Sequence, residues 1–317
     1  MELTVETTCP TQWKFSYESD DPQLDELYEL AKKDQWNVTE DIDWDRQIRD
    51  DADILDRSQD LFGGTKFFQS LSAETQSQIA ANQTAFMISQ FLHGEQGALL
   101  CCGQLVDTVP DIEGKLYAAT QVMDEARHVE VFNKYLGLLD NSYPMDPALK
   151  AVVDAILAHE SWQAKCVGMQ VLVESLAMGT FRMMMKASAD ELLRDIVTLT
   201  ARDEARHVSF GIISMNHEIP KLSEDEREQL EDFGFQAISI LFGENGIGSG
   251  GEIMADAGVD PEEATKAIIE EVMESGDMSS NDMRLQTVRE YMLPNLEKVG
   301  LLTERIRPQY KAAGFLP

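Results

Sequence analysis

The chain has 317 residues, of which 43% are hydrophobic, so it is long enough to bury one large core or two ordinary ones. Its 57 acidic residues outnumber its 26 basic residues and give a formal net charge of −31. This charge argues against nucleic acid and anionic membrane surfaces as partners, because both are polyanions that basic surfaces bind.

Long stretches without glycine or proline predict an all-helical protein. After an irregular segment over 1–21, we expect a short amphipathic helix over 22–36. The segment 37–62 is acidic and mixed, and its pattern predicts no element. Four long helices are then predicted over 73–108, 111–138, 147–186 and 189–217. Short connections between long helices are typical of a four-helix bundle.

The C-terminal part of the sequence predicts further helices over 223–243, 261–275 and 280–303. The Gly-rich segment 243–251 lacks the Lys-Ser/Thr of a phosphate-binding loop, so we interpret it as a hinge. The expected fold is all-α, a ferritin-like four-helix bundle with additional N- and C-terminal helices. Its expected parts are an N-terminal arm and short helix (1–71), the bundle (72–220) and C-terminal helices packed on it (221–317), within a single domain.

The four cysteines form no C-x-x-C pair, which disfavours both a disulfide framework and a zinc finger. The start of the sequence is acidic and has no apolar stretch typical of a signal peptide. No uncharged apolar run approaches the ~18 residues of a membrane span. We therefore expect a cytoplasmic protein without a membrane partner.

One five-residue motif occurs twice. The sequence Asp-Glu-Ala-Arg-His stands at 124–128 and again at 203–207, and we call these copies the first and second motif. Each contains Glu-x-x-His on a predicted helix, where positions i and i+3 share a face. In carboxylate di-iron bundles, two helices each supply Glu-x-x-His and two others each supply one glutamate.

The sequence places a single glutamate on the helix before each motif. Glu95 precedes Glu125 by 30 residues, and Glu174 precedes Glu204 by the same interval. The two halves are thus offset by 79 residues at three positions (95 to 174, 125 to 204 and 128 to 207), which indicates an internal pseudo-repeat. The predicted ligands of two metal ions are Glu95, Glu125, His128, Glu174, Glu204 and His207.

The neighbours of these glutamates argue against the alternative that they lie on solvated helix faces. Each glutamate shares its face with apolar residues, such as Phe91 beside Glu95 and Phe181 beside Glu174. Buried carboxylates are costly unless they are paired or bound to metal. Carboxylate oxygens with two imidazoles suit iron or manganese. The three other histidines, His93, His159 and His217, lack this spacing and are expected at the surface or in packing.

The motifs also suggest residues that support the ligands. Asp124 and Asp203 each precede a ligand and are candidates to accept a hydrogen bond from a metal-bound histidine. Arg127 and Arg206 are candidates to pair with these aspartates. The alternative is that these four residues are exposed helix charges.

Polar residues one turn from the ligands are candidates for catalysis. Gln121, Gln170 and Thr200 are expected to orient dioxygen or hold a proton, with ordinary hydrogen bonds between helices as the alternative. Four apolar residues are expected to form a hydrophobic chamber beside the metals: Phe91, Phe132, Met178 and Phe181.

At these residues the chain resembles the ferritin-like, ribonucleotide-reductase-like superfamily of di-iron carboxylate proteins, over about 72–217. The repeated motif resembles bacterial multicomponent monooxygenases and acyl-carrier-protein desaturases more than ferritins. Trp36 and the segment 41–44 resemble the N-terminal arm of several oxygenases. By this resemblance the six predicted ligands carry over as the ligands of two iron ions, with Mn/Fe as the alternative to Fe/Fe.

Two positions differ from particular members of the superfamily. Radical-generating reductase subunits typically have a tyrosine one turn after the first ligand histidine, where this sequence has Phe132. Arylamine N-oxygenases add a third histidine one turn before the last glutamate, where this sequence has Thr200.

The expected function is that of a di-iron monooxygenase which activates O₂ to hydroxylate or N-oxygenate a small organic substrate. The alternatives are an acyl desaturase or oxidase, and a ferritin-like protein that handles metal or peroxide. The sequence has no flavin, NAD or Fe–S motif, so a separate ferredoxin or reductase is expected to supply electrons. A homodimer is expected as well.

Overall fold

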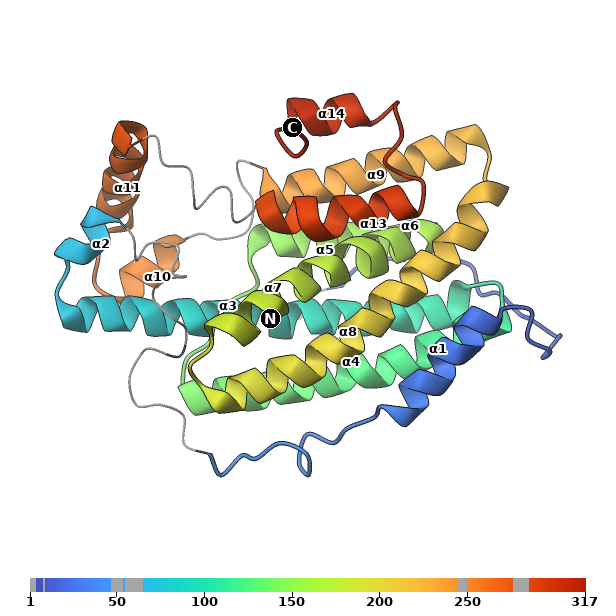
Figure 1. Cartoon of the computed structure of the whole chain (residues 1–317), viewed down its shortest axis with the longest axis horizontal. Helices are drawn as coiled ribbons and strands as arrows, with labels where there is room; N and C mark the ends of the chain where they lie inside the picture. Colours follow the sequence, from blue (N-terminus) through green and yellow to red (C-terminus); the bar gives the residue numbers. More distant parts are fainter. Residues whose placement is uncertain (1–3, 8, 47–53, 55–64, 244–249, 276–284) are drawn as a thin grey trace.

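The structure, a computed structural model, describes residues 4–7, 9–46, 54, 65–243, 250–275 and 285–317. These residues form helices and connecting segments without a β-strand ladder, as predicted. The long helices lie side by side along the length of the molecule (Figure 1). The central helices are α3 (Ala73–Thr108), α4 (Ile112–Leu139), α7 (Glu174–Ala187) and α8 (Glu191–Glu218).

Side-chain caps begin three of the central helices. Ser72 accepts a hydrogen bond from the amide of Thr75 at the start of α3. Asp111 and Asp190 begin α4 and α8 in the same way. Such caps satisfy backbone N–H groups that have no partner within the helix. The helices predicted over 73–108, 111–138 and 189–217 are therefore confirmed to within two residues.

The prediction of a single helix over 147–186 is wrong. α5 (Pro147–Ala158) ends at His159, which is in an extended conformation. The Nδ1 atom of His159 accepts a hydrogen bond from the amide of Ser161. Ser161 then caps α6 (Trp162–Cys166). The sequence had suggested continuity because this break contains neither glycine nor proline.

The helix that leads to Glu174 contains a π-helical segment. α6 continues without interruption into η2 (Val167–Val173), which is π-helical, and η2 continues into α7. A π-helical turn holds one more residue than an α-helical turn, and such turns are frequent at functional sites. α6, η2 and α7 therefore together form the third of the four helices of the bundle.

Further helices surround the four central ones. α1 (Pro22–Lys33), shorter than the predicted 22–36, packs on α4 and α8 (Figure 1). α9 (Glu224–Phe242) packs on α5 and η2, close to the predicted 223–243. α13 (Leu293–Lys298) contacts η2 and α8.

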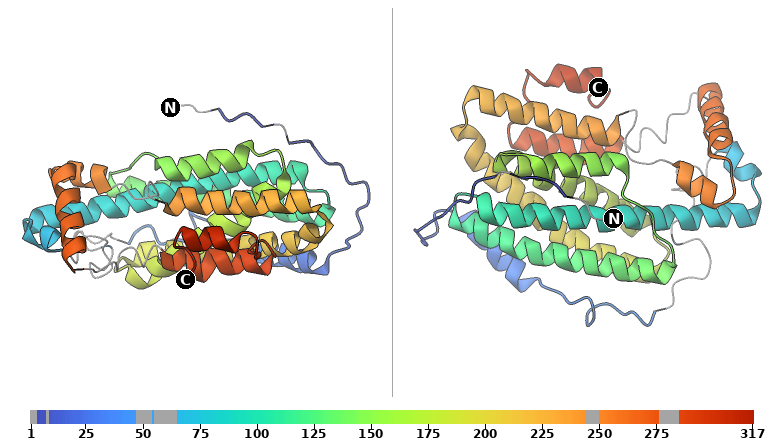
Figure 2. Two further views of the ribbon diagram at one scale, coloured as in Figure 1. Left: turned by 90° about the horizontal axis from the view of Figure 1, so that it is seen from above. Right: turned by 180° about the vertical axis from the view of Figure 1, so that it is seen from behind.

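One end of α3 carries a separate group of short helices (Figures 1 and 2). α10 (Gly250–Asp256) packs on α3, and α2 (Lys66–Ser70) packs on α11 (Pro261–Ser275). α11 has the predicted bounds, whereas α2 and α10 were not predicted. Most of the predicted hinge over 243–251 lies outside the described residues, and its last two glycines begin α10.

The end of the chain differs from its prediction. The helix expected over 280–303 begins outside the described residues. Within them, a π-helical segment, η4 (Val288–Met292), precedes α13, and the chain then turns at Gly300, which has a φ of +78°. Glycine is favoured at such a φ because it has no Cβ. α14 (Arg307–Ala312) was not predicted.

None of the helices in the described part of the chain is long and apolar enough to cross a membrane.

Candidate metal centre

The six predicted ligands come from the four central positions of the bundle and meet in its interior. α3 supplies Glu95 and α7 supplies Glu174. α4 and α8 supply the Glu-x-x-His pairs of the first and second motif. All six side chains are buried, with Glu95 the most exposed residue at 5%. The structure therefore brings every predicted ligand together.

The ligand atoms form two overlapping sets of four. Glu95 and His128 belong to one set, and Glu174 and His207 belong to the other. Glu125 and Glu204 belong to both sets, and the atoms within each set lie within 4.8 Å of one another. The centre thus has two ends, which we call the Glu95 end and the Glu174 end, joined by two shared carboxylates.

Both histidines turn the same ring nitrogen toward the carboxylates. The Nδ1 atom of His128 lies 3.1 Å from Glu204 and 3.2 Å from Glu125. The Nδ1 atom of His207 lies 2.9 Å from Glu204 and 3.1 Å from Glu125. Nδ1 is therefore the atom of each histidine that is placed to bind a metal.

The other ring nitrogen of each histidine faces an aspartate of the opposite motif. The Nε2 atom of His128 lies 3.2 Å from Asp203, and that of His207 lies 3.3 Å from Asp124. A carboxylate in this position fixes which nitrogen carries the proton and holds the ring in place. The aspartate of each motif thus orients the histidine of the other motif, across the contact between α4 and α8.

Two arginines each pair with both aspartates. We call Asp124, Asp203, Arg127 and Arg206 the buried square of charges. The Nη2 atom of Arg127 lies 2.5 Å from Asp124 and 2.8 Å from Asp203. The Nη2 atom of Arg206 lies 3.0 Å from Asp124 and 2.7 Å from Asp203. The side chains of all four residues are at most 4% exposed. The pairing expected from the sequence is therefore present, whereas the alternative of exposed charges is excluded.

Two residues after α1 complete the square, and the sequence did not identify them as site residues. Trp36 donates from Nε1 to Asp203 at 2.7 Å. Gln35 donates to Asp124 at 2.9 Å and accepts from Arg127 at 2.7 Å. They lie beyond the end of α1, so helical periodicity carried no signal for them. The only signal was the resemblance of Trp36 to oxygenase N-terminal arms.

The carboxylates keep the buried histidines protonated when no metal is bound. Burial opposes the charged form of His207, but Glu125 and Glu204 raise its pKa to about 10. His128 is also buried, and Glu95 with Asp203 raises its pKa well above the ordinary value. Burial and the negative charge of Glu204 raise the pKa values of Glu95 and Glu174. The cluster therefore holds protons where cations would otherwise balance its charge.

The aspartates respond in the opposite direction. Burial would raise the pKa of Asp124, but the hydrogen bond with His207 and the charges around it lower it to about 2. Burial likewise opposes ionisation of Asp203, whose pKa is nevertheless lowered by His128 and Arg206. Both aspartates are thus ionised at neutral pH.

Two of the three predicted catalytic polar residues contact the ligands or each other. The Nε2 atom of Gln121 lies 2.8 Å from Glu125, 3.2 Å from Glu174 and 2.9 Å from the Oε1 atom of Gln170. Gln170 donates from its own Nε2 atom to the sulfur of Cys102 at 3.5 Å. Thr200 is also buried, but its hydroxyl donates to the carbonyl of Ile196 at 3.1 Å.

Three of the four residues predicted to form a hydrophobic chamber pack as a group of rings. The ring centroid of Phe91 lies 5.6 Å from that of Phe132 and 4.7 Å from that of Phe181. The centroids of Phe132 and Phe181 are 5.9 Å apart. Met178 packs against the same hydrophobic cluster. Phe91 and Phe132 each stand one turn from a ligand of the Glu95 end, so the rings lie at that end.

The three remaining histidines make contacts outside the cluster. The Nε2 atom of His93 lies 3.0 Å from the carbonyl oxygen of Tyr143. The ring of His159 packs edge-on against Phe233. His217 is half exposed and pairs with Asp21 at 2.8 Å. These contacts agree with the surface or packing positions expected from the sequence.

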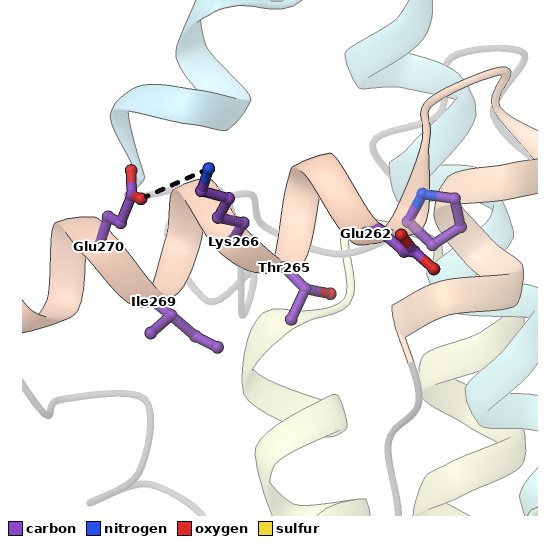
Figure 3. A pocket seen from close by; sticks show the side chains of 6 residues that line it. Glu262, Thr265, Lys266, Ile269 and Glu270 are labelled. Carbon is purple, nitrogen blue, oxygen red and sulfur yellow. Dashed lines mark ion pairs between the residues drawn. The ribbon is translucent and has the colours of Figure 1, made fainter.

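A hollow on the surface of α11 is a separate feature. Successive turns of that helix line it, and Ile269 lies beside the ion pair of Lys266 with Glu270 (Figure 3). α11 supplies no residue to the carboxylate cluster. The hollow is therefore not a part of the candidate centre.

A family model matches most of the chain. The model describes the P-aminobenzoate N-oxygenase AurF and matches residues 18–290, which include all six predicted ligands. The chain belongs to the AurF family. Thr200 stands one turn before Glu204, where a third histidine is expected of arylamine N-oxygenases. His128 and His207 are the histidines of the carboxylate cluster within the described residues.

Solved structures of R2-like ligand-binding oxidases share the fold of this AurF-family chain. One, with an aerobically reconstituted Mn/Fe cofactor, is 17% identical with a TM-score of 0.52, covering 89% of this chain and 95% of the other. Another, with an aerobically reconstituted Fe/Fe cofactor, is 18% identical with a TM-score of 0.52, covering 89% and 94%. They support the predicted ferritin-like architecture. The comparison with curated proteins gave no match.

Proposed function

We propose that this AurF-family protein is a non-haem di-iron oxygenase that uses O₂ to N-oxygenate or hydroxylate a small organic molecule. The observation that carries the proposal is the pair of ligand sets that share Glu125 and Glu204 in the interior. Family membership over residues 18–290 supports the same reaction class. Fe/Fe is the cofactor we propose, with Mn/Fe as the alternative.

The buried residues fit a pair of metal ions. The Oε1 atom of Glu204 is buried, lies 3.1 Å from the Nδ1 atom of His128 and makes no well-aligned hydrogen bond within the described part of the chain. Four carboxylates in a dry interior also need cations to balance them. Glu95 with His128 and Glu174 with His207 would each hold one ion, and Glu125 with Glu204 would be available to both. Once bound, the iron pair supplies the electrons and open positions needed to activate O₂.

The protein itself supplies orientation, dryness and proton control. We propose that Asp124 and Asp203 hold the imidazole rings so that Nδ1 faces the metals, and that Arg127 and Arg206 keep these aspartates ionised. Gln121 and Gln170 provide amide groups that can hold a proton or a water beside Glu125 and Glu174. Thr200 provides a buried hydroxyl one turn before Glu204.

The substrate side of the centre is proposed to be the Glu95 end. The rings of Phe91, Phe132 and Phe181 pack there, and the burial of Phe132 and Phe181 would keep water from the reacting atoms. An apolar, ring-lined region suits the ring of an aromatic amine, since aromatic rings pack well at offset or edge-on angles. We therefore propose an arylamine as the first substrate class to test.

The test is a single-turnover reaction. The purified chain is loaded with two equivalents of ferrous iron without oxygen, then mixed with O₂ and either an arylamine or its ring analogue without the amine. We expect an oxygenated product from the arylamine, detected by mass spectrometry with ¹⁸O₂. An acyl substrate that loses two hydrogens would favour a desaturase instead. Fast iron oxidation without any product would reject an oxygenase in favour of metal or peroxide handling.

The electrons are proposed to come from a separate protein. The sequence has no flavin, NAD or Fe–S motif of its own, and one O₂ needs two electrons beyond those that the substrate provides in a hydroxylation. A ferredoxin or reductase is therefore the proposed donor. Multiple turnovers that require such a donor would support this assignment.

A homodimer is also part of the proposal, with its interface on α3 and α4. Three neighbouring exposed positions of α3 and four of α4 carry no charge, although the exposed Asp107 lies between the two groups in the sequence: Gln96, Leu100, Gly103, Leu116, Ala119, Met123 and Ala126. The two helices lie side by side in the view from behind (Figure 2). We call this set the uncharged face. Leu100 and Met123 are 54% and 60% exposed.

The occupant proposed for the uncharged face is a second copy of the chain. Two molecules with a formal charge of −31 each repel one another over most of their surfaces. They approach with least repulsion where charges are absent, whereas a basic partner would favour acidic residues. A two-fold axis makes such a face self-complementary.

We propose a cytoplasmic location, which agrees with the four free cysteines. We also propose that the arm (1–71), bundle (72–220) and C-terminal helices (221–317) fold as one domain. The hydrogen bonds of Gln35 and Trp36 to the aspartates of the bundle support this view.

A further inference from the structure

The pseudo-repeat makes the two ends of the centre comparable position by position. The 79-residue offset relates ligand to ligand, but it also relates the residues one turn away. Phe91 corresponds to Gln170, and both stand four residues before a lone glutamate. Phe132 corresponds to Gly211, and both stand four residues after a histidine. The ligands are therefore repeated, while these residues one turn away are not.

A third pair of positions follows the same rule. Phe181 corresponds to Cys102, seven residues after Glu174 and Glu95 respectively. The three rings that pack together at the Glu95 end thus have Gln170, Gly211 and Cys102 as their counterparts. These counterparts also meet, since Gln170 donates to Cys102 at 3.5 Å and lies against Gly211. One cluster is aromatic, and its equivalent is polar and small.

Gly211 allows the backbone of η2 to approach α8. A Cβ atom at this position would lie 2.5 Å from the Cβ atom of Gln170 and 3.2 Å from its carbonyl carbon. Real Cβ atoms do not come this close to another carbon, so any side chain at 211 would push the π-helical segment away. Only glycine permits the observed position of Gln170.

The position of Gln170 in turn fixes Gln121. The Oε1 atom of Gln170 lies 2.9 Å from the Nε2 atom of Gln121, which also faces Glu125 and Glu174. At the other end, the residue equivalent to Gln121 is Thr200, whose hydroxyl donates to a backbone carbonyl instead. Within the described residues, Glu95 has only His128 as a hydrogen-bond partner.

We propose that Gly211 and Gln170 are positioning residues that hold the Gln121 amide against Glu174 and Glu125, so that the two metal positions are unequal. Glu174 then accepts from an amide donor, whereas Glu95 has no such donor within the described residues. This inference rests on the proposed di-metal function.

The test compares the binding of Mn²⁺ in four proteins. Mn²⁺ is stable in air, and its free form is measured directly by electron paramagnetic resonance. The variants are Gly211→Ala, which obstructs Gln170, and Gln170→Met, which removes the amide without a clash. Gly137→Ala is the matched control, because it makes the same change on a helix where a Cβ meets no atom within 4 Å.

We expect the unaltered chain and Gly137→Ala to bind two Mn²⁺ per chain. Gly211→Ala and Gln170→Met should retain one tight site and bind the other ion at least tenfold more weakly. A loss confined to one of two ions separates positioning from a general loss of structure, which would weaken both. Circular dichroism and the thermal midpoint of each metal-free variant monitor the fold.

Two results would overturn the inference. If Gln170→Met binds both ions with unaltered affinity, the Gln170 amide has no positioning role, whatever the result for Gly211→Ala. If Gly211→Ala folds and binds both ions normally, the close approach of Gln170 to Gly211 is not needed for metal binding. Failure of the unaltered chain to bind two ions would instead reject the proposed function itself.

Discussion

The Nε2 atom of His128 lies 3.2 Å from the carboxylate of Asp203, although the two residues belong to different copies of the repeated motif. The reciprocal contact joins His207 to Asp124 at 3.3 Å. Each aspartate therefore orients the histidine of the other motif, which lies at the opposite end of the centre from the histidine of its own motif. A change in one motif should be felt at the other end of the centre.

Replacing Asp203 tests this exchange. Asp203→Asn removes the carboxylate that orients His128 and leaves Arg127 without one of its two carboxylate partners. We expect the affinity for Mn²⁺ to fall by about 10- to 100-fold, the usual effect of losing such a partner. Competition with a metal chelator measures the change. Asp195→Asn is the control, because Asp195 is half exposed, and an equal effect in both variants would contradict the exchange.

Removing a terminal ligand should divide the metal content. Glu174→Ala deletes one of the two unshared carboxylates, so we expect about half of the iron to remain bound and the reaction with O₂ to be lost. Elemental analysis and stopped-flow absorption measure these two quantities. Glu130→Ala changes an exposed glutamate of α4 and should leave both unaltered. Full iron content with normal turnover in Glu174→Ala would count against the ligand assignment.

The metal-free protein should lose stability as the pH rises. The pKa of His207 is raised from 6.5 to about 10, so its contribution to folding is complete below pH 6.5 and is lost as the pH passes through about 10. The raised pKa values of Glu95 and Glu174 act in the same direction above pH 4.5. Urea denaturation at several pH values measures the free energy of unfolding.

Metal loading supplies the comparison for this pH series. Bound ions take the place of the protons on these groups, so the loaded protein should show a much flatter profile between pH 6.5 and 9. A metal-free protein whose stability rises over this interval would contradict the electrostatic account of the cluster.

The rings at the Glu95 end also contribute to stability. Phe181 is fully buried, and Phe181→Ala should lower the free energy of unfolding by about 3–5 kcal/mol. The same change should admit bulkier substrates, which product analysis would detect. Phe15→Ala alters a residue that is 78% exposed, and its effect should stay within about 0.5 kcal/mol. Equal effects of the two variants would argue against a packed ring cluster at this end.

A charge placed on the uncharged face should separate the proposed dimer. Leu100→Glu adds a carboxylate to a surface where two acidic molecules are proposed to meet. We expect sedimentation equilibrium to show at least a tenfold weaker association. Leu30→Glu, on the exposed side of α1, is the control. A monomeric unaltered chain would reject the dimer, and an unaffected dimer would place its interface elsewhere.

The sequence predicted the ligand cluster because helical spacing and duplication act together. A three-residue spacing fixes which side chains share a face, and the 79-residue offset links Glu95 to Glu174 although they lie on different helices. The cluster of ligand atoms agrees with this arithmetic. Helix ends such as Ser72 were predictable for a similar local reason, since a cap acts on the amide three residues later.

Other features depend on tertiary contacts that no local pattern encodes. The break at His159 relies on its own side chain accepting from Ser161, and the sequence there contains no strong helix breaker. The π-helical segment before Glu174 relies on the space that Gly211 leaves on α8. Trp36 reaches Asp203 across 167 positions of the chain, so periodicity could not link them.

The same long-range contact has a consequence during synthesis. Trp36 and Gln35 leave the ribosome early, but the aspartate that Trp36 binds and the last ligand, His207, follow much later. Until then Glu204 and His207 are missing from the ligand cluster, and Asp203 is not yet present to orient His128. The proposed centre can therefore be completed only after α8 has emerged, because Glu204 and His207 lie on that helix.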